Sequence, residues 1–411
     1  MTITYLNNIP YLEEQNLNDL IKKIQTPFYL YSQNKITDNY KKLKKSLDSE
    51  IYFSVKSNSN QAIISHLYSL GAGFDVVSEE EILRVLNVGV SPSKIIFEGV
   101  GKTESSIRLA ITKKIKQINV ESIEELKTIN EIALSLNTTQ EIGIRINPDI
   151  DAKTINKIST GRKNDKFGIC FDELKNICEI LKNLKNINFS SLTCHIGSQI
   201  FEIETFKNIF YKMKESINIC EKNKCEIKHL DLGGGFGFDY NYKKKFDLTQ
   251  LANLIKNTFK KNEYKISFEP GRYIIANAGY LITKIITCKT NGDINFLITD
   301  AGMQTLLRPA IYNSFHKIIP FNKENDEKTY TIAGPICESS DILANNIKLP
   351  LQKKNDYLII CDVGAYGSVM SSNYNSKCLP AEVLIKENKY LIIREAENIN
   401  DIIKKDIIPN W

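Results

Sequence analysis

A lysine follows an alternating run of β-branched and aromatic residues, Ile-Tyr-Phe-Ser-Val at positions 51–55. Such a run predicts a buried β-strand that delivers Lys56 at its C-terminal end. A partly desolvated lysine has a lowered pKa, and its free amine can form an imine with an aldehyde. Most lysines at strand ends are solvated edge residues, so this chemistry needs support from other parts of the chain.

Two glycine-containing segments supply further candidate groups. A Gly-Gly-Gly-Phe-Gly run at 233–237 follows the strand-like run 227–232, and Glu269-Pro-Gly271-Arg272 follows another at 265–268. Successive glycine N–H groups can approach an anion closely, and a phosphate is their natural guest. A glycine run on its own is equally consistent with a flexible turn.

Glu269 is the third candidate, since a carboxylate at a strand end can hold a proton on a ring nitrogen. Taken alone, it is better explained by an ion pair with a nearby lysine or arginine. Together, a lysine amine, a phosphate cradle and a ring-facing carboxylate are the parts that pyridoxal phosphate needs.

The elements that must position these groups form a regular series. Strand-like runs alternate with segments of helical periodicity, which predicts a parallel sheet, and eight strands are the number that closes a (β/α)8 TIM barrel. The eight runs are 51–55, 74–77, 94–97, 117–120, 142–146, 189–195, 227–232 and 265–268. In such a barrel the chemistry gathers at the C-terminal strand ends, where the candidate residues lie.

After about Gly279 the pattern changes to closely spaced strands with few helices between them. These strand-like runs are 280–286, 295–299, 329–333, 357–361 and 382–394, and a short one is expected at 26–33. We therefore expect a barrel domain at 36–276 and a mainly-β domain at 277–411, which also includes residues 1–35.

Composition excludes several classes of protein. The net charge of +6 is a small difference between 54 basic and 48 acidic residues, so no nucleic-acid surface is expected. No leader-like or membrane-spanning apolar stretch is evident, which favours a cytoplasmic protein. The nine cysteines are scattered without a C-x-x-C pair, as expected for reduced, mostly buried thiols, and no metal site is predicted.

The motifs together resemble the fold-type III pyridoxal-phosphate-dependent decarboxylases, whose barrel is alanine racemase-like. The barrel motifs are Tyr52-Phe-Ser-Val-Lys56-Ser-Asn58, Arg145-Ile-Asn-Pro148, Ser159-Thr-Gly161, Lys166-Phe-Gly168, His195-Ile-Gly-Ser198, Gly233-Gly-Gly-Phe-Gly237 and Glu269-Pro-Gly-Arg272. The motifs of the second domain are most similar to the diaminopimelate decarboxylase branch: Asp300-Ala-Gly302, Arg308-Pro-Ala-Ile-Tyr312, Gly334-Pro-Ile-Cys337-Glu338-Ser-Ser-Asp341 and Gly364-Ala-Tyr366-Gly.

The resemblance implies decarboxylation of meso-2,6-diaminopimelate to L-lysine and carbon dioxide by a homodimer. The residues it implies for the cofactor are Lys56, Asp75, His195, Ser198, Gly234, Gly235, Glu269, Gly271, Arg272 and Tyr366. Those for the substrate are Arg272, Arg308, Tyr312, Glu338 and Tyr366. Lys56 would carry the cofactor and His195 would stack on its ring. Cys337 would lie near the carbon that is protonated, and Cys337 and Glu338 would come from the partner subunit.

Three other interpretations stay open at this point. Ornithine, arginine or carboxynorspermidine decarboxylases share the barrel motifs, and the segments at 308–312 and 337–341 argue against them. An alanine racemase tends to place an arginine where this chain has Glu269. A catalytically silent binding protein would not need Lys56, Glu269 and Cys337. The chain departs from the family's pattern at Ile155, where histidine is common, and at Gln304, which is often Asn or Asp.

Overall fold

The computed structural model describes residues 3–152, 160–260, 263–322 and 326–411. They form two compact units. The barrel unit comprises 39–239 and 244–273, and the β unit comprises the chain up to Asp38, 240–243 and 274–411. Among the described residues, no helix combines the length and apolar character needed to cross a membrane.

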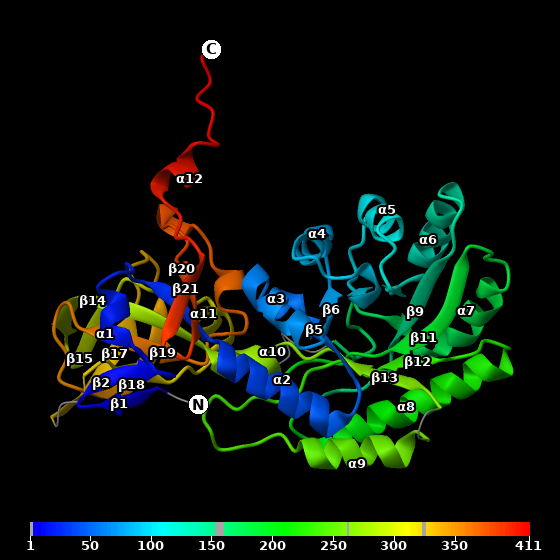
Figure 1. Cartoon of the computed structure of the whole chain (residues 1–411), viewed down its shortest axis with the longest axis horizontal. Coiled ribbons are helices and arrows are strands. Elements are labelled where there is room, and N and C mark those ends of the chain that lie inside the picture. Colours follow the sequence, from blue (N-terminus) through cyan, green and yellow to red (C-terminus); the bar gives the residue numbers. More distant parts are fainter. Residues whose placement is uncertain (1–2, 153–159, 261–262, 323–325) are drawn as a thin grey trace. The chain divides into compact units, whose positions relative to one another are not determined.

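Eight parallel strands of the barrel unit close on themselves in the order β5-β6-β7-β8-β9-β11-β12-β13, with β13 pairing to β5. Figure 1 labels β5, β6, β9, β11, β12 and β13 among them. Their bounds are β5 Glu50–Ser54, β6 Gly73–Val76, β7 Ile95–Phe97, β8 Gln117–Val120, β9 Gln140–Asn147, β11 Ile187–Thr193, β12 His229–Asp231 and β13 Lys265–Phe268. A two-residue strand, β10 (Ile169–Cys170), pairs with β9 outside this ring. The predicted barrel is confirmed, and each strand coincides with one of the eight predicted runs.

Helix α2 precedes the first barrel strand, further helices follow the barrel strands, and the sequence caps several of them. The bounds are α2 Gln33–Leu47, α3 Gln61–Ser69, α4 Glu79–Asn87, α5 Glu104–Thr112, α6 Ile123–Ser135, α7 Leu174–Leu181, α8 Ile203–Lys222 and α9 Leu248–Thr258. The side chain of Ser78 accepts the Glu81 N–H at the start of α4, and Ser122 does the same for Glu125 at α6. These caps satisfy N–H groups that the first helical turn leaves unpaired. A four-residue helix, α10 (Arg272–Ile275), follows β13.

The β unit contains a large, mainly antiparallel sheet with the order β18-β17-β15-β14-β4-β20-β21, in which β19 also pairs with β14 and β16 with β19. The bounds are β4 Phe28–Ser32, β14 Gly279–Asn291, β15 Ile294–Thr299, β16 Ile318–Pro320, β17 Glu327–Ala333, β18 Ile342–Pro350, β19 Tyr357–Cys361, β20 Ala381–Lys386 and β21 Lys389–Arg394. A small sheet has β1 Thr4–Leu6, β2 Ile9–Leu12 and β3 Gln15–Asn16, and the helices are α1 Leu17–Ile21, α11 Arg308–Tyr312 and α12 Ile399–Ile403. The predicted mainly-β domain is confirmed.

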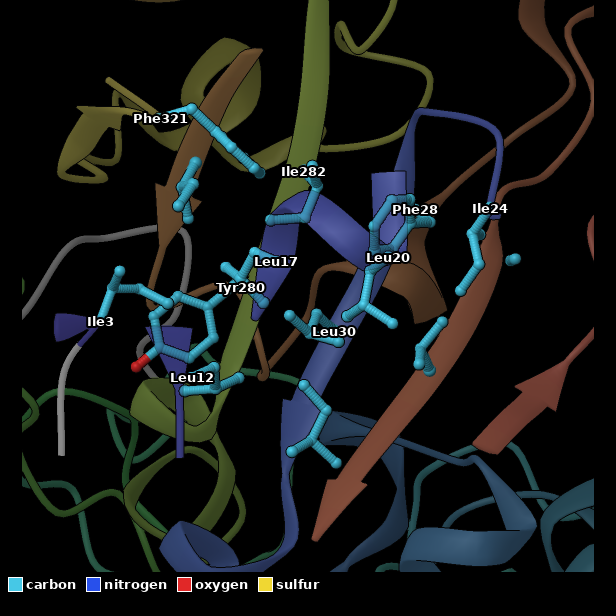
Figure 2. Close-up of a cluster of buried hydrophobic side chains, with 14 of the residues drawn as sticks. Ile3, Leu12, Leu17, Leu20, Ile24, Phe28, Leu30, Tyr280, Ile282 and Phe321 are labelled. Carbon is cyan, nitrogen blue, oxygen red and sulfur yellow. The ribbon is translucent and has the colours of Figure 1, made fainter. Parts of the chain in front are cut away.

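The N-terminal residues belong to the core of this β unit. Leu17 and Leu20 of α1 pack in one buried cluster with Phe28 of β4 and with Tyr280 and Ile282 of β14 (Figure 2). Strand β4 lies between β14 and β20, so residues far apart in the sequence share one sheet. Removing these side chains from water is the main stabilising term for the unit.

Candidate active site

Lys56 lies just beyond its strand. β5 ends at Ser54, and Lys56 occupies a short 3-10 turn, Val55–Ser57, rather than the strand end that the sequence predicts. The turn forms because Asn58 donates its N–H to the Val55 carbonyl and the Ser57 hydroxyl bonds to the Ser54 carbonyl. The Lys56 side chain is 38% exposed, so its amine is accessible to a reactant.

Asp75 on β6 fixes the lysine amine. Its Oδ2 lies 3.1 Å from Lys56 Nζ, and the carboxylate is fully buried. The Ser54 hydroxyl donates to the same oxygen at 2.6 Å. The other oxygen, Oδ1, has no hydrogen-bond partner among the described residues. An unpartnered buried oxygen beside a reactive amine marks a place for a ligand atom.

Glu269 follows β13, the neighbour of β5 on its other side. It is 5% exposed, and its Oε1 also lacks a hydrogen-bond partner among the described residues. Burial raises the pKa of Glu269 well above its usual range, and the nearby carboxyls of Asp231 and Asp75 raise it further. A negative charge on the buried Glu269 carboxyl is therefore costly unless a cation is placed beside it.

A buried ionic network lies on the neighbouring strands, and sequence reasoning missed most of it. Arg145 on β9 lies 2.8 Å from Glu121 and 3.4 Å from Glu98, which follow β8 and β7. The Asn119 side chain donates to Glu98. Burial raises the pKa of Glu98, although Arg145 opposes the shift. The available signal was a charged residue placed directly after each buried strand.

His195 follows β11 and is held as a neutral ring. The Gly234 N–H donates to its Nδ1 at 3.1 Å, so the neutral ring carries its hydrogen on Nε2. Burial lowers the pKa of His195 well below its usual value, and the positive charges of Lys56 and Arg145 lower it further. A neutral imidazole can lie against an aromatic ligand without repelling a cationic ring.

The glycine run after β12 allows a close approach of backbone segments. Gly235 has a φ of +81°, and a Cβ there would stand 2.1 Å from the Gly197 carbonyl oxygen. A Cβ on Gly271 would stand 2.8 Å from Ser57. Gly234 places its N–H against His195, as described above. Only glycine fits these positions, because a side chain would collide with the neighbouring loops at this end of the barrel.

Arg272 and Ser198 face each other at this end of the barrel. The Arg272 guanidinium donates to the Ser198 hydroxyl from both Nε and Nη2, each at 3.3 Å. Arg272 is 9% exposed. A buried arginine beside a hydroxyl and glycine N–H groups is a suitable anion site.

Other predicted site residues belong to the β unit. Arg308 begins α11 and is buried, with Nη1 donating to the Tyr240 hydroxyl at 2.8 Å and Nη2 to Ser314 at 3.1 Å. Its guanidinium also lies over the Tyr240 ring, 4.8 Å from the centroid. Tyr312 is half-buried at the other end of the same helix. These contacts orient the arginine fork.

Cys337 and Glu338 lie on an exposed turn after β17. The Tyr374 hydroxyl donates to Glu338 Oε2 at 2.9 Å and Ser340 donates to Oε1 at 2.5 Å. These hydrogen bonds lower the pKa of Glu338, so it is a carboxylate at neutral pH. Tyr366 adopts a positive φ of 58° on the loop after β19. Ile155, where the family often has histidine, lies outside the described residues.

Comparison with known proteins gives the family. Residues 33–276 match the model for the pyridoxal binding domain of pyridoxal-dependent decarboxylases. A diaminopimelate decarboxylase from Aquifex aeolicus is 38% identical, over 98% of this chain and 97% of the relative. The chain belongs to the diaminopimelate decarboxylase family. This confirms the predicted resemblance and the predicted cofactor, pyridoxal phosphate.

Solved members of the family share the whole fold. A diaminopimelate decarboxylase from Helicobacter pylori, complexed with L-lysine, is 37% identical with a TM-score of 0.91, covering 95% of this chain and 98% of that one. One from M. jannaschii, also in complex with L-lysine, is 34% identical with a TM-score of 0.94, covering 99% and 98%. A lysine decarboxylase from Selenomonas ruminantium, at 23% identity and a TM-score of 0.83, shares the fold alone.

The barrel unit of this family member fits pyridoxal phosphate on its own geometry. The unpartnered Glu269 Oε1 suits a ring N–H donor, and the carboxyl-rich surroundings suit a cationic ring. Lys56 could supply the amine for the aldehyde. The glycine loops, Ser198 and Arg272 could supply donors for a phosphate.

Proposed function

We propose that this chain removes carbon dioxide from meso-2,6-diaminopimelate and produces L-lysine, the last step of lysine biosynthesis. The observation that carries the proposal is that Lys56, Asp75 and Glu269 lie at the C-terminal ends of three adjacent strands, β5, β6 and β13. The family supports it, and L-lysine, which two solved relatives hold, is the product of this reaction.

Pyridoxal phosphate, when bound, supplies a ring that accepts the electrons left behind when carbon dioxide departs. Lys56 would hold the cofactor, with Asp75 directing its amine. Glu269 would keep a proton on the ring nitrogen, because a buried carboxylate stabilises the cation beside it. Gly235, Gly271, Ser198 and Arg272 would hold the phosphate, and Gly234 would hold His195 beside the cofactor.

His195 would cover one face of the ring and exclude water from it. Its orientation is set by the Gly234 N–H, and its neutral state by burial and by the two nearby cations. Asp75 and Tyr366 complete the predicted cofactor contacts. Exclusion of water strengthens every charge interaction in the site.

We propose that Arg272, Arg308, Tyr312 and Tyr366 bind the carboxylates of the substrate. The guanidinium fork of Arg308 is fixed by Tyr240 and Ser314, so little side-chain entropy is lost when it binds a planar group. Glu338, a carboxylate at neutral pH, would bind the distal ammonium. Cys337, or a water that it positions, would donate the proton that replaces carbon dioxide.

The exposed turn that carries Cys337 and Glu338 supports the proposal of a homodimer in which each subunit lends this turn to its partner's site. Mixing Lys56→Ala and Cys337→Ala dimers under exchange conditions should then restore about one quarter of the wild-type activity, since half the dimers are mixed and each has one intact site. Absence of restoration, with subunit exchange verified, would contradict shared sites.

We also propose a cytoplasmic location, because the described cysteines are free.

The test of the activity is release of carbon dioxide and L-lysine from meso-diaminopimelate, run beside ornithine and arginine. Turnover of meso-diaminopimelate alone supports the proposal. Preference for ornithine or arginine would assign a sister decarboxylase and would refute the roles given to Arg308 and Glu338. Cofactor binding without release of carbon dioxide from any of these substrates would support a binding protein.

Arg308→Lys keeps the positive charge but not the two-pronged guanidinium, and should raise the KM for meso-diaminopimelate about tenfold or more.

A further inference from the structure

The β unit contains a pocket of about 530 Å³ whose lining residues all belong to that unit. This volume is within the usual range for sites that bind small molecules. The lining comes from distant parts of the chain: the residues around β1, the start of α2, the segment 240–243, the start of β14, and strands β16 and β19 with their flanking residues. Among the described residues, none of the predicted cofactor or substrate residues lines it. The pocket is therefore a candidate site of its own.

One side of the pocket is apolar. Ile3, Tyr280 and Pro320 are buried, and Ile319 is half-buried. Ile3 and Tyr280 are also part of the buried cluster shown in Figure 2. The Tyr5 hydroxyl donates to the Pro320 carbonyl, which holds β1 against β16. Core packing therefore fixes this side of the pocket, and it can cover the apolar part of a ligand.

Three charged side chains line the same pocket. Asp362 is 3% exposed, and the Tyr242 hydroxyl donates to its Oδ2. The Lys317 amine lies over the Tyr242 ring, 5.7 Å from the centroid, and Lys35 is the third charged residue of the lining. In the described part of the chain, neither lysine amine forms a close ion pair with a carboxylate. Both amines are therefore available to an anionic group.

The charges of the pocket are one negative and two positive. Burial raises the pKa of Asp362 to about 6, while the hydrogen bond from Tyr242 and the positive charges of Lys317 and Lys35 limit the rise. Asp362 is thus mostly ionised slightly above neutral pH. A carboxylic acid without an amine would leave Asp362 with no cation beside it, and an amine without a carboxylate would bring a third positive charge to the two lysines. A molecule with both groups matches this lining best.

We propose that the pocket binds a small zwitterionic amino acid with an apolar side chain. The carboxylate of the ligand would lie between the amines of Lys35 and Lys317, and its ammonium group would pair with Asp362. The apolar side chain would lie against Tyr280 and Ile319. Hydrogen bonds between charged groups are stronger than those between neutral groups, so they would set the orientation of the ligand.

Calorimetric titration of the full-length protein with three matched probes, at about pH 7.5, tests the proposal. L-Phenylalanine carries both charged groups, 3-phenylpropionate lacks the ammonium group, and 2-phenylethylamine lacks the carboxylate. We expect the Kd for L-phenylalanine to be at least about tenfold lower than the Kd for either of the other probes. Equal affinities for L-phenylalanine and 3-phenylpropionate would overturn the proposal. So would the absence of binding of both L-phenylalanine and the smaller L-leucine up to about 10 mM.

Variants of the charged residues locate the binding. Lys317→Met, at an exposed position, and Lys35→Met should each raise the Kd for L-phenylalanine about tenfold or more. Lys386→Met, at an exposed lysine of β20, is the matched control and should leave it unchanged. Asp362→Asn should weaken binding of L-phenylalanine but not of 3-phenylpropionate, since only the first has an ammonium group. Unchanged affinity in both pocket-lysine variants would overturn the proposal.

A last variant separates this pocket from the proposed substrate site. Arg308→Lys should leave the Kd for L-phenylalanine unchanged, because Arg308 does not line the pocket. A loss of affinity in Arg308→Lys as large as that in Lys317→Met would assign the binding to the substrate site and overturn the proposal. The titration measures binding and not turnover, so its outcome is independent of the proposed decarboxylation.

Discussion

Replacing Arg145 with methionine should destabilise the barrel unit by about 3–5 kcal/mol, the usual cost of removing one partner from a buried ion pair. The guanidinium lies 2.8 Å from Glu121 and 3.4 Å from Glu98, and none of the three side chains is more than 8% exposed. Methionine keeps most of the apolar packing of the arginine stem. The loss is therefore mainly that of the cation between two buried carboxyls.

Protonation of a buried carboxyl limits the loss of stability in Arg145→Met. Glu98 can take up a proton once Arg145 is gone, because burial already raises its pKa, and this limits the cost. For a unit of this size, each kcal/mol lowers Tm by about 2–4 °C, so the expected decrease is about 6–20 °C. Adding Glu121→Gln to the variant should recover part of the loss, since it removes one of the uncompensated charges.

The assay is thermal and urea unfolding of the cofactor-free protein across pH 5–8. Arg108→Met, at an exposed arginine bonded to Ser135, is the matched control and should change stability by less than about 0.5 kcal/mol. A carboxyl with a raised folded-state pKa loses stability as pH rises, so the deficit of Arg145→Met should widen from pH 5 to pH 8. A deficit below 1 kcal/mol, or one independent of pH, would refute this reasoning.

Three other predictions concern single residues. Gly235→Ala should weaken binding of pyridoxal phosphate about tenfold or more by absorbance titration, because of the 2.1 Å clash with Gly197, whereas Gly89→Ala, with a similar φ of +86° and open space, should not. Glu269→Gln should retain the cofactor but lower kcat by about 10²–10³; an unchanged kcat would exclude a charged partner for the ring nitrogen. Burial lowers the pKa of His229 to about 3, so the free energy of unfolding of the wild type should fall by about 5 kcal/mol as pH decreases from 6.5 toward 3. His229→Gln should make this decrease smaller, as measured by urea unfolding.

The barrel was predictable because strand-like and helical segments alternate regularly along the sequence. Each of the eight strands is a short apolar run followed by a helix, and loops such as 233–237 and 269–272 carry their own turn chemistry. The strands of the β unit were harder to predict from the sequence. Strand β18 (Ile342–Pro350) is interrupted by Asn346 at a positive φ, and β16 has only three residues, so neither shows a clear alternation.

The candidate site could be predicted where one residue carries an unusual signal. Lys56, Glu269 and the glycine run stand out from their segments, and the structure places them just beyond the ends of neighbouring strands. Glu98 and Glu121 gave only a weak signal, because a single acidic residue after a strand is usually solvated. Their burial depends on strand order around the barrel. The contact of Cys178 with Cys220 likewise depends on the packing of α7 against α8, which no spacing rule reveals.

The most direct measurement for the central claim is mass spectrometry of the purified protein after borohydride reduction, with peptide mapping and an assay of L-lysine from meso-diaminopimelate. A pyridoxyl group on Lys56 together with L-lysine production is the predicted result. Lys102, whose side chain is 1% exposed beside Glu125, serves as the internal control and should be unmodified. A pyridoxyl group on another lysine, or none at all, would contradict the assignment of Lys56 as the residue that holds the cofactor.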